Sequence, residues 1–241
     1  MKQRKLPREG IIFVTGTDTG VGKTVVTALL LLHLREQGVR ALGMKPFCSG
    51  SREDVEMLRA IQGDELPAPL VNPFYFEDPV APWLAAKNLG RTIRLSQAIR
   101  RINEAKQHCD LLLVEGAGGL FSPLGNRFTA LDLITELRAE VFIVAPNRIG
   151  CVGQVLLTTE ALKNARIAPA RVVLIGQKNP DKSAQSNTAT LREWSPRTPI
   201  ASVPYLLNLG TRQRGEISIA QNKLKYLLHD PRALIQLGQF F

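Results

Sequence analysis

The sequence contains no long uninterrupted apolar run. Of its 241 residues 44% are hydrophobic, yet no apolar stretch approaches the roughly 20 residues that a membrane-spanning helix needs. The basic opening segment MKQRKLPREG is not followed by the apolar stretch and small-residue cleavage site of a secretory signal. We therefore expect a cytoplasmic protein with no membrane partner, in which residues 1–10 form a flexible basic tail.

Cysteine is scarce as well. The chain has three cysteines, Cys48, Cys109 and Cys151, which lie far apart in the sequence. An odd number at irregular spacing argues against a disulfide framework and against a cysteine metal cluster. In a reducing compartment we expect three small, buried side chains.

Aromatic residues make up only 6% of the chain, although its formal charge is +10. Such a charge is compatible with contact to nucleic acid or membrane, or with a solvated surface that carries pockets for anionic ligands. The basic residues are spread along the chain, and aromatic residues do not alternate with them in a stacking pattern. The composition therefore does not favour nucleic-acid binding.

The chain alternates short apolar runs with longer amphipathic ones and has no internal repeat. Strands are predicted at 11–15, 39–46, 110–116, 140–146, 171–176 and 199–204, and helices at 22–38, 54–63, 95–108, 130–137, 152–165 and near 217–229. The proline-rich segment 66–83 is expected to leave the core. Buried strands separated by helix-length segments predict a single α/β domain over residues 1–241, with a mostly parallel sheet flanked by helices on both faces.

The stretch VTGTDTGVGKT, residues 14–24, is typical of a phosphate-binding loop. A strict loop has a glycine five positions before Gly22, but that position holds Thr17 and the nearest glycine is Gly16. The alternative is a plain turn that joins a strand to a helix. Lys23 and Thr24 after the last glycine favour a nucleotide loop that is one residue longer than usual, and hence a P-loop nucleoside triphosphate hydrolase fold.

In such a loop the backbone N–H groups and the helix N-terminus cradle phosphate oxygens. Gly20 and Gly22 permit positive φ angles and close backbone approach. Lys23 is then expected to reach the β and γ phosphates, and the hydroxyl of Thr24 is expected to bind Mg²⁺.

Two carboxylates are candidates for the remaining metal ligands. Glu115 ends the apolar run LLLVEG, and Asp54 opens a helix after the second strand. Carboxyl ends of parallel strands are where such sheets place their ligands, but Glu115 is also suited to capping a turn and Asp54 to capping its helix. Asp110 precedes its strand and is therefore expected at the opposite edge of the sheet.

Lys45 stands at the end of the second predicted strand, just before Pro46. A lysine there can neutralise charge that develops on phosphates; the alternative is a surface lysine without a role. Ser49 and Gly50 follow in the next loop and are positioned to donate hydrogen bonds to an anion.

These motifs together resemble the dethiobiotin synthetase family. The matching segments are GTDTGVGKT (16–24), KPFCSG (45–50), VNPFYFEDPVAP (71–82), LLVEGAGGLFSPL (112–124), IGCVGQVLLT (149–158) and SVPYL (202–206). They span almost the whole chain in the expected order, and the longer loop is that family's form of the phosphate loop.

The resemblance implies a reaction. Such enzymes join CO₂ to 7,8-diaminononanoate (7,8-diaminopelargonate) with ATP and Mg²⁺, in biotin biosynthesis. A substrate nitrogen takes up CO₂ as a carbamate, the carbamate attacks the γ-phosphate to give a mixed carbamic-phosphoric anhydride, and the second amine closes the cyclic urea. The family also implies a homodimer with the substrate site near its interface.

The resemblance further implies roles for individual residues. The implied catalytic residues are Lys45, Lys23 and Thr19, and the implied metal ligands are Thr24, Asp54 and Glu115. The implied nucleotide-binding residues are Thr19, Gly20, Val21, Gly22, Lys23, Thr24, Val25, Glu115, Gln177 and Pro204. The implied substrate-binding residues are Lys45, Ser49, Gly118, Gly150 and Cys151.

The sequence departs from the family pattern at two places. Gly153 stands where the family often has an asparagine beside the substrate tail, and Gln177 stands where an asparagine commonly contacts adenine. Neither change touches the residues assigned to the metal or the phosphoryl groups.

Two other function classes are compatible with parts of the sequence. A partitioning-type ATPase, a nucleotide-dependent dimer switch on DNA or membrane, has a lysine where this chain has Asp18, and the segment 222–230 is short for a membrane helix. An amidotransferase related to cobyrinate amidation needs a glutaminase domain, but too few residues follow Gly176 to form one.

Overall fold

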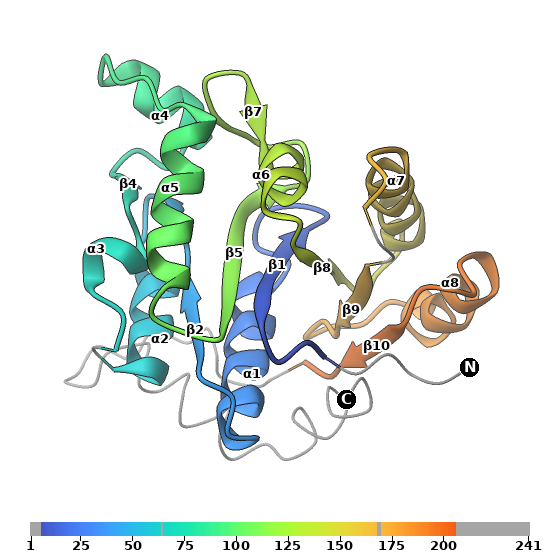
Figure 1. The fold of residues 1–241 in the computed structure, drawn as a ribbon. Helices are drawn as coiled ribbons and strands as arrows, with labels where there is room; N and C mark the ends of the chain where they lie inside the picture. The colour runs from blue at the N-terminus through green and yellow to red at the C-terminus, as the bar shows by residue number, and fades with distance from the viewer. Residues whose placement is uncertain (1–5, 64, 168–169, 206–241) are drawn as a thin grey trace, which may run out of the picture.

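The computed structural model describes residues 6–63, 65–167 and 170–205. The helix predicted near 217–229, like residues 1–5 of the predicted basic tail, lies outside the described residues. The described part is built on a six-stranded sheet of order β10-β9-β8-β1-β5-β2 in which every neighbouring pair is parallel. Its strands are β1 (Gly10–Gly16), β2 (Ala41–Met44), β5 (Leu111–Gly119), β8 (Glu140–Pro146), β9 (Arg171–Ile175) and β10 (Ile200–Val203). The predicted parallel sheet is therefore confirmed (Figure 1).

Helices cover both faces of this sheet, as predicted. They include α1 (Lys23–Glu36), α2 (Glu53–Gln62), α5 (Leu95–Lys106), α6 (Ala130–Leu137), α7 (Cys151–Asn164) and α8 (Asn187–Trp194). α1 packs with α2, whereas α5 packs with α6, and α7 packs with α8. Right-handed crossovers place α1 on one face and α5, α6 and α7 on the other, which is the arrangement that Figure 1 shows.

The core lies along the two central strands. Residues 12–14 of β1 and 111–114 of β5 are buried, because helices cover both faces and leave no polar side. The leucine run 29–31 of α1 is buried as well. This continuous apolar character is why the strands read as unbroken runs rather than as alternating patterns.

The predicted second strand is split in the structure. β2 ends at Met44, the N–H of Lys45 donates to the carbonyl of Val71 at 2.8 Å, and Pro46 has no N–H to continue a ladder. The chain then forms β3 (Phe47–Ser49), which pairs with β4 (Phe74–Phe76) in a sheet of their own.

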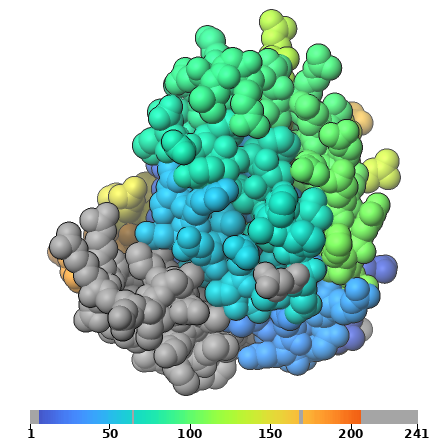
Figure 2. All heavy atoms as spheres, turned by 90° about the vertical axis from the view of Figure 1, so that its left-hand side faces the viewer, coloured from blue at the N-terminus to red at the C-terminus, as the bar shows by residue number. Residues whose placement is uncertain are grey.

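Segment 66–83 leaves the main sheet as predicted, but it is partly ordered. It contains α3 (Ala68–Val71) and β4, and α4 (Pro82–Asn88) begins near its end. Figure 2 shows the segments from α2 to α5 forming a continuous surface on the side of the edge strand β2. Elements that the sequence did not reveal are the hairpin of β6 (Pro123–Gly125) and β7 (Phe128–Thr129), the short 3-10 helix η1 (Lys182–Gln185) and α8.

Within the ranges that the structure describes, no helix has both the length and the apolar character needed to cross a bilayer.

Candidate active site

The phosphate loop joins β1 to α1. Gly22 caps α1 with a φ of 97°, a conformation that a side chain disfavours. A Cβ on Gly16 would lie 2.8 Å from Cγ2 of Val21 and 2.9 Å from the carbonyl oxygen of Asp18. The loop therefore folds back tightly over Gly16, and this contact explains why the outer glycine of the loop stands at position 16.

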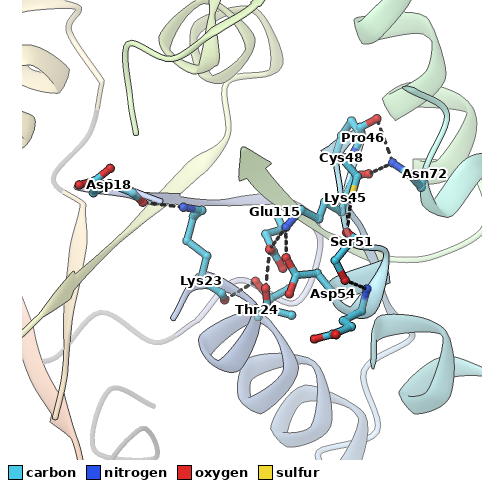
Figure 3. A network of polar contacts seen from close by, with 12 residues as sticks. Asp18, Lys23, Thr24, Lys45, Pro46, Cys48, Ser51, Asp54, Asn72 and Glu115 are labelled. Carbon is cyan, nitrogen blue, oxygen red and sulfur yellow. Dashed lines mark hydrogen bonds and ion pairs between the residues drawn. The ribbon is translucent and has the colours of Figure 1, made fainter. Parts of the chain in front are cut away.

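Lys23 and Thr24 open α1; the Lys23 side chain points back to Asp18 of the phosphate loop, whereas Thr24 points to Glu115 of β5 (Figure 3). Nζ of Lys23 donates to the carbonyl oxygen of Asp18 at 2.7 Å. Burial lowers the pKa of Lys23 to about 8, against the attraction of Glu115. Oγ1 of Thr24 donates to Oε1 of Glu115 at 2.7 Å.

Lys45 lies between the two predicted carboxylates. Its Nζ is 2.9 Å from Oε1 of Glu115 and also contacts Oδ2 of Asp54. Burial by itself lowers the pKa of Lys45, but the charges of Glu115 and Asp54 outweigh it and raise that pKa above its ordinary value. Lys45 is 7% exposed, so its interpretation as a surface lysine is wrong.

The strand register explains how these residues meet. Met44 of β2 pairs with Val114 of β5, so the following residues, Lys45 and Glu115, emerge together at the carboxyl edge. Glu115 pairs in turn with Val14 near the end of β1. Asp110 lies at the other end of β5, where its N–H donates to Arg40, as the sequence predicted.

The three predicted metal ligands are suited to Mg²⁺. Glu115 is fully buried, and its Oε2 has no hydrogen-bond partner among the described residues. Asp54 lies in the first turn of α2, whose N-cap is Arg52, so Asp54 is not the helix cap. Two carboxylates and a hydroxyl, completed by phosphate oxygens and water, form the oxygen set that Mg²⁺ prefers. The described residues contain no cluster of three or more His, Cys, Asp or Glu side chains for another kind of metal site.

A cavity of about 540 Å³ opens over this cluster. Eleven predicted site residues line it: Thr19, Gly20, Gly22, Lys23, Thr24, Val25, Lys45, Ser49, Asp54, Glu115 and Gly118. Val21 is buried beneath the loop instead. The remaining predicted residues lie away from the cavity, Gln177 and Pro204 after β9 and β10, and Gly150 and Cys151 at the start of α7.

Several cavity residues were missed by sequence reasoning. Pro79, Val80, Ala81 and Pro82 line it from the segment that leaves the sheet. Nδ2 of Asn72, from the same segment, donates to the carbonyl of Lys45 at 2.8 Å. The motif VNPFYFEDPVAP marked this segment, but the four residues of it that line the cavity are proline, valine and alanine, which carry no reactive groups that would have pointed to the site.

The Gln177 side chain turns back onto its own strand. Its Nε2 donates to the carbonyl of Ile175 at 2.8 Å and of Gly176 at 3.2 Å. At the start of α7, the N–H of Cys151 donates to the carbonyl of Arg148 at 3.1 Å, and Gly153 has open space around its Cα.

The chain is similar to known proteins. A family model described as AAA domain matches residues 11–213. The ATP-dependent dethiobiotin synthetase BioD of Anaeromyxobacter dehalogenans (strain 2CP-C) is 36% identical over 221 residues, which cover 89% of this chain and 99% of that protein. BioD 1 of Escherichia coli (strain K12) is 34% identical over 202 residues, covering 80% and 90%.

Among solved structures, the MinD cell division protein of Aquifex aeolicus has a TM-score of 0.60 at 15% identity, covering 96% of this chain and 94% of that one. At such low identity the likeness shows the fold alone, that of a P-loop nucleoside triphosphate hydrolase. The family match and the identity over nearly full length go further: the chain belongs to the AAA domain family and, within it, to the dethiobiotin synthetases.

Proposed function

We propose that this chain closes 7,8-diaminononanoate with CO₂ and ATP to form dethiobiotin, through a carbamate and a mixed carbamic-phosphoric anhydride, as a step of biotin biosynthesis. One observation carries the proposal. Two buried lysines, Lys23 from the phosphate loop and Lys45 from the neighbouring strand end, line one cavity together with three ligands suited to a metal.

The reaction brings a carbamate against the γ-phosphate, and two anions repel one another. Cations fixed beforehand in a partly dehydrated site offset this repulsion more strongly than water does. Lys23 is placed to face the phosphates and Lys45 to face the carbamate. Ser49 borders the same cavity, and its buried Oγ has no partner among the described residues, so it is able to donate to the carbamate.

Thr24, Asp54 and Glu115 are the residues that we expect to hold Mg²⁺. When bound, the metal neutralises phosphate charge. The chain's own contribution is to keep these oxygens in place: Thr24 through its hydrogen bond to Glu115, and Asp54 and Glu115 through their shared contact with Lys45.

We further propose that the chain forms a homodimer through the face made by α7, α8 and the loop before α7. Three large apolar side chains are exposed there, Ile149 at 78%, Leu157 at 75% and Trp194 at 71%. α7 and α8 lie side by side (Figure 1). A second copy that covers this face would bring the start of α7, with Gly150 and Cys151, to the interface. The N–H of Cys151 donates to Arg148, and the N–H groups that follow it in the first turn of α7 are suited to the substrate carboxylate.

The cytoplasm is the compartment that suits this activity. All three cysteines are free and buried, which fits a reducing environment in which thiols serve as small apolar side chains. The dimer-switch ATPase is the less favoured reading, because the position of its cross-dimer lysine is occupied here by Asp18.

The decisive experiment supplies the purified chain with ¹⁴C-bicarbonate, ATP, Mg²⁺ and 7,8-diaminononanoate. We expect label in dethiobiotin with one ADP and one phosphate per product, and no label when either the diamine or ATP is omitted. ATP hydrolysis without labelled product, together with duplex DNA binding that weakens steeply with salt, would instead support the partitioning-type ATPase.

A further inference from the structure

Two loops at the carboxyl edge of the sheet are joined by side chains that the phosphate chemistry does not use. One loop, residues 147–150, links β8 to α7, and the other, residues 176–186, links β9 to α8. The strands are parallel neighbours, and Pro146 pairs with Ile175 just before the loops begin.

Next to the strands, the two loops are joined by the buried side-chain amides of Asn147 and Asn187. Nδ2 of Asn187 donates to Oδ1 of Asn147 at 2.9 Å, and Nδ2 of Asn147 donates to the carbonyl of Ala184 at 3.1 Å. The backbone N–H of Asn147 also donates to the carbonyl of Ile175 at 2.7 Å. The first residue of the 147–150 loop is thus fixed on the β9 side.

Asp181 makes a second connection between the two loops. Its Oδ2 accepts the backbone N–H of Ile149 at 2.9 Å. Its Oδ1 accepts the N–H of Ser183 at 2.9 Å and the Oγ of Ser183 at 2.5 Å. The hydrogen bonds from Ser183 and from Ile149 lower the pKa of Asp181 below its ordinary value, so the carboxylate that makes them is ionised at neutral pH.

The hydrogen bond between Ile149 and Asp181 affects the start of α7. Ile149 directly precedes Gly150, the N-cap of α7, so holding the N–H of Ile149 fixes the direction in which the chain enters the helix. The free N–H groups of a helix's first turn bind an anion only when they converge on one point. Asp181 is also four residues beyond Gln177 in the same loop, which ties the start of α7 to the segment assigned to the nucleotide base.

We propose that Asp181 is a positioning residue that, through Ile149, holds the first turn of α7 in the geometry that binds the substrate's carboxylate tail. The proposal rests on the proposed function, which places that tail at α7. Asp181 acts on the affinity for the tail and leaves the phosphoryl step unaffected, because neither the phosphate loop nor the cluster of Lys45, Asp54 and Glu115 contacts it.

The test compares two diamines in wild-type protein and in Asp181→Ala. One is 7,8-diaminononanoate, and the other is 2,3-diaminooctane, a vicinal diamine without the carboxylate. We expect Asp181→Ala to raise the KM for 7,8-diaminononanoate about tenfold, the effect of losing one hydrogen bond to a charged group. The kcat, the KM for ATP and the KM for 2,3-diaminooctane should change by less than about twofold. Equal increases for both diamines, or no increase for either, would overturn the proposal.

Two further variants separate positioning from a general structural role. Asp181→Asn keeps an oxygen that can accept the N–H of Ile149 and should recover most of the affinity. Ser183→Ala removes the hydroxyl bond on the other carboxylate oxygen but leaves Ile149 held, so its KM should stay close to wild type. If Ser183→Ala is as impaired as Asp181→Ala, the hydrogen bonds between Asp181 and Ser183, rather than the one from Ile149 to Asp181, determine the affinity for the tail.

Hydrogen exchange measured on the free protein tests whether Asp181 holds Ile149, and it requires no enzymatic reaction. The amide of Ile149 should exchange at least about tenfold faster in Asp181→Ala than in wild type. An unchanged exchange rate would refute the proposal that Asp181 holds the N–H of Ile149. If wild-type protein makes no dethiobiotin, the proposed function fails and the role in tail affinity fails with it, while the exchange rate still decides whether Asp181 holds Ile149.

Discussion

The ammonium of Lys45 lies 2.9 Å from Oε1 of Glu115, although the two residues are 70 positions apart in the chain. Glu115 is fully buried, and its carboxylate also accepts the hydroxyl of Thr24. A buried charge is tolerated only when a partner compensates it. The pair therefore links the stability of the fold to the charge that we assign to the reaction.

Replacing Lys45 by Met should reduce both stability and activity. Met keeps the length of the apolar stem but leaves Glu115 without its cation, and breaking a buried pair on one side costs about 3 kcal/mol or more. For a chain of this size that corresponds to a fall in Tm of roughly 6–12 °C. Thermal unfolding and the labelled-bicarbonate reaction measure the two effects.

The double variant Lys45→Met/Glu115→Gln tests the cause. Removing both charges should recover most of the lost Tm, because no uncompensated charge remains buried, while product formation stays absent. A double variant as unstable as the single one would show that Lys45 supports the fold by packing rather than by charge.

Replacing Lys23 by Met should abolish product without destabilising the chain. The pKa of Lys23 is lowered to about 8 by burial, so the folded state disfavours its charged form relative to the unfolded state at neutral pH. Losing one fixed donor at a developing charge costs about 100-fold or more in rate. The measurement pairs product formation with Tm, and a large drop in Tm would contradict this account.

Replacing Glu115 by Gln should weaken Mg²⁺-nucleotide binding. Gln retains the shape and an oxygen but removes the charge that a hard cation prefers, and we expect the Mg²⁺ concentration for half-saturation to rise at least about tenfold. Calorimetric titration of nucleotide at graded Mg²⁺ measures this without turnover. Asp110→Asn is the matched control, since Asp110 directly precedes the opposite end of β5; unchanged Mg²⁺ dependence in Glu115→Gln would remove Glu115 from the metal site.

Replacing Leu157 by Glu should convert the proposed dimer into a monomer. Leu157 is exposed on α7, and a charge buried without a partner at an interface opposes association. Sedimentation velocity of the variant is to be compared with that of Leu89→Glu, which changes an exposed leucine just beyond α4. If both variants sediment like the wild-type chain, α7 is not the interface.

Local pattern was sufficient for much of the fold. The apolar runs of β1, β5 and β8 have the composition of strands buried on both faces, and the structure confirms them. The hydrophobic pattern did not predict elements whose local sequence is ambiguous. The run 39–46 reads as one strand, but Pro46 cannot continue a ladder and the chain changes sheets there. The helix α8 has only two buried residues, Asn187 and Leu191, too few to produce an apolar stripe.

The sequence by itself determined the phosphate loop and the alternation of strands and helices, because both depend on residues that are close together in the chain. It also marked Lys45, Asp54 and Glu115 as strand-end or helix-start residues. Only the tertiary structure decided that these three meet, since that depends on β5 lying between β1 and β2 and on the register that sets Met44 against Val114. Only the tertiary structure likewise shows the hydrogen bond from Ile149 to Asp181. These two residues are 32 positions apart, and they meet because two strands pair rather than because of any local motif.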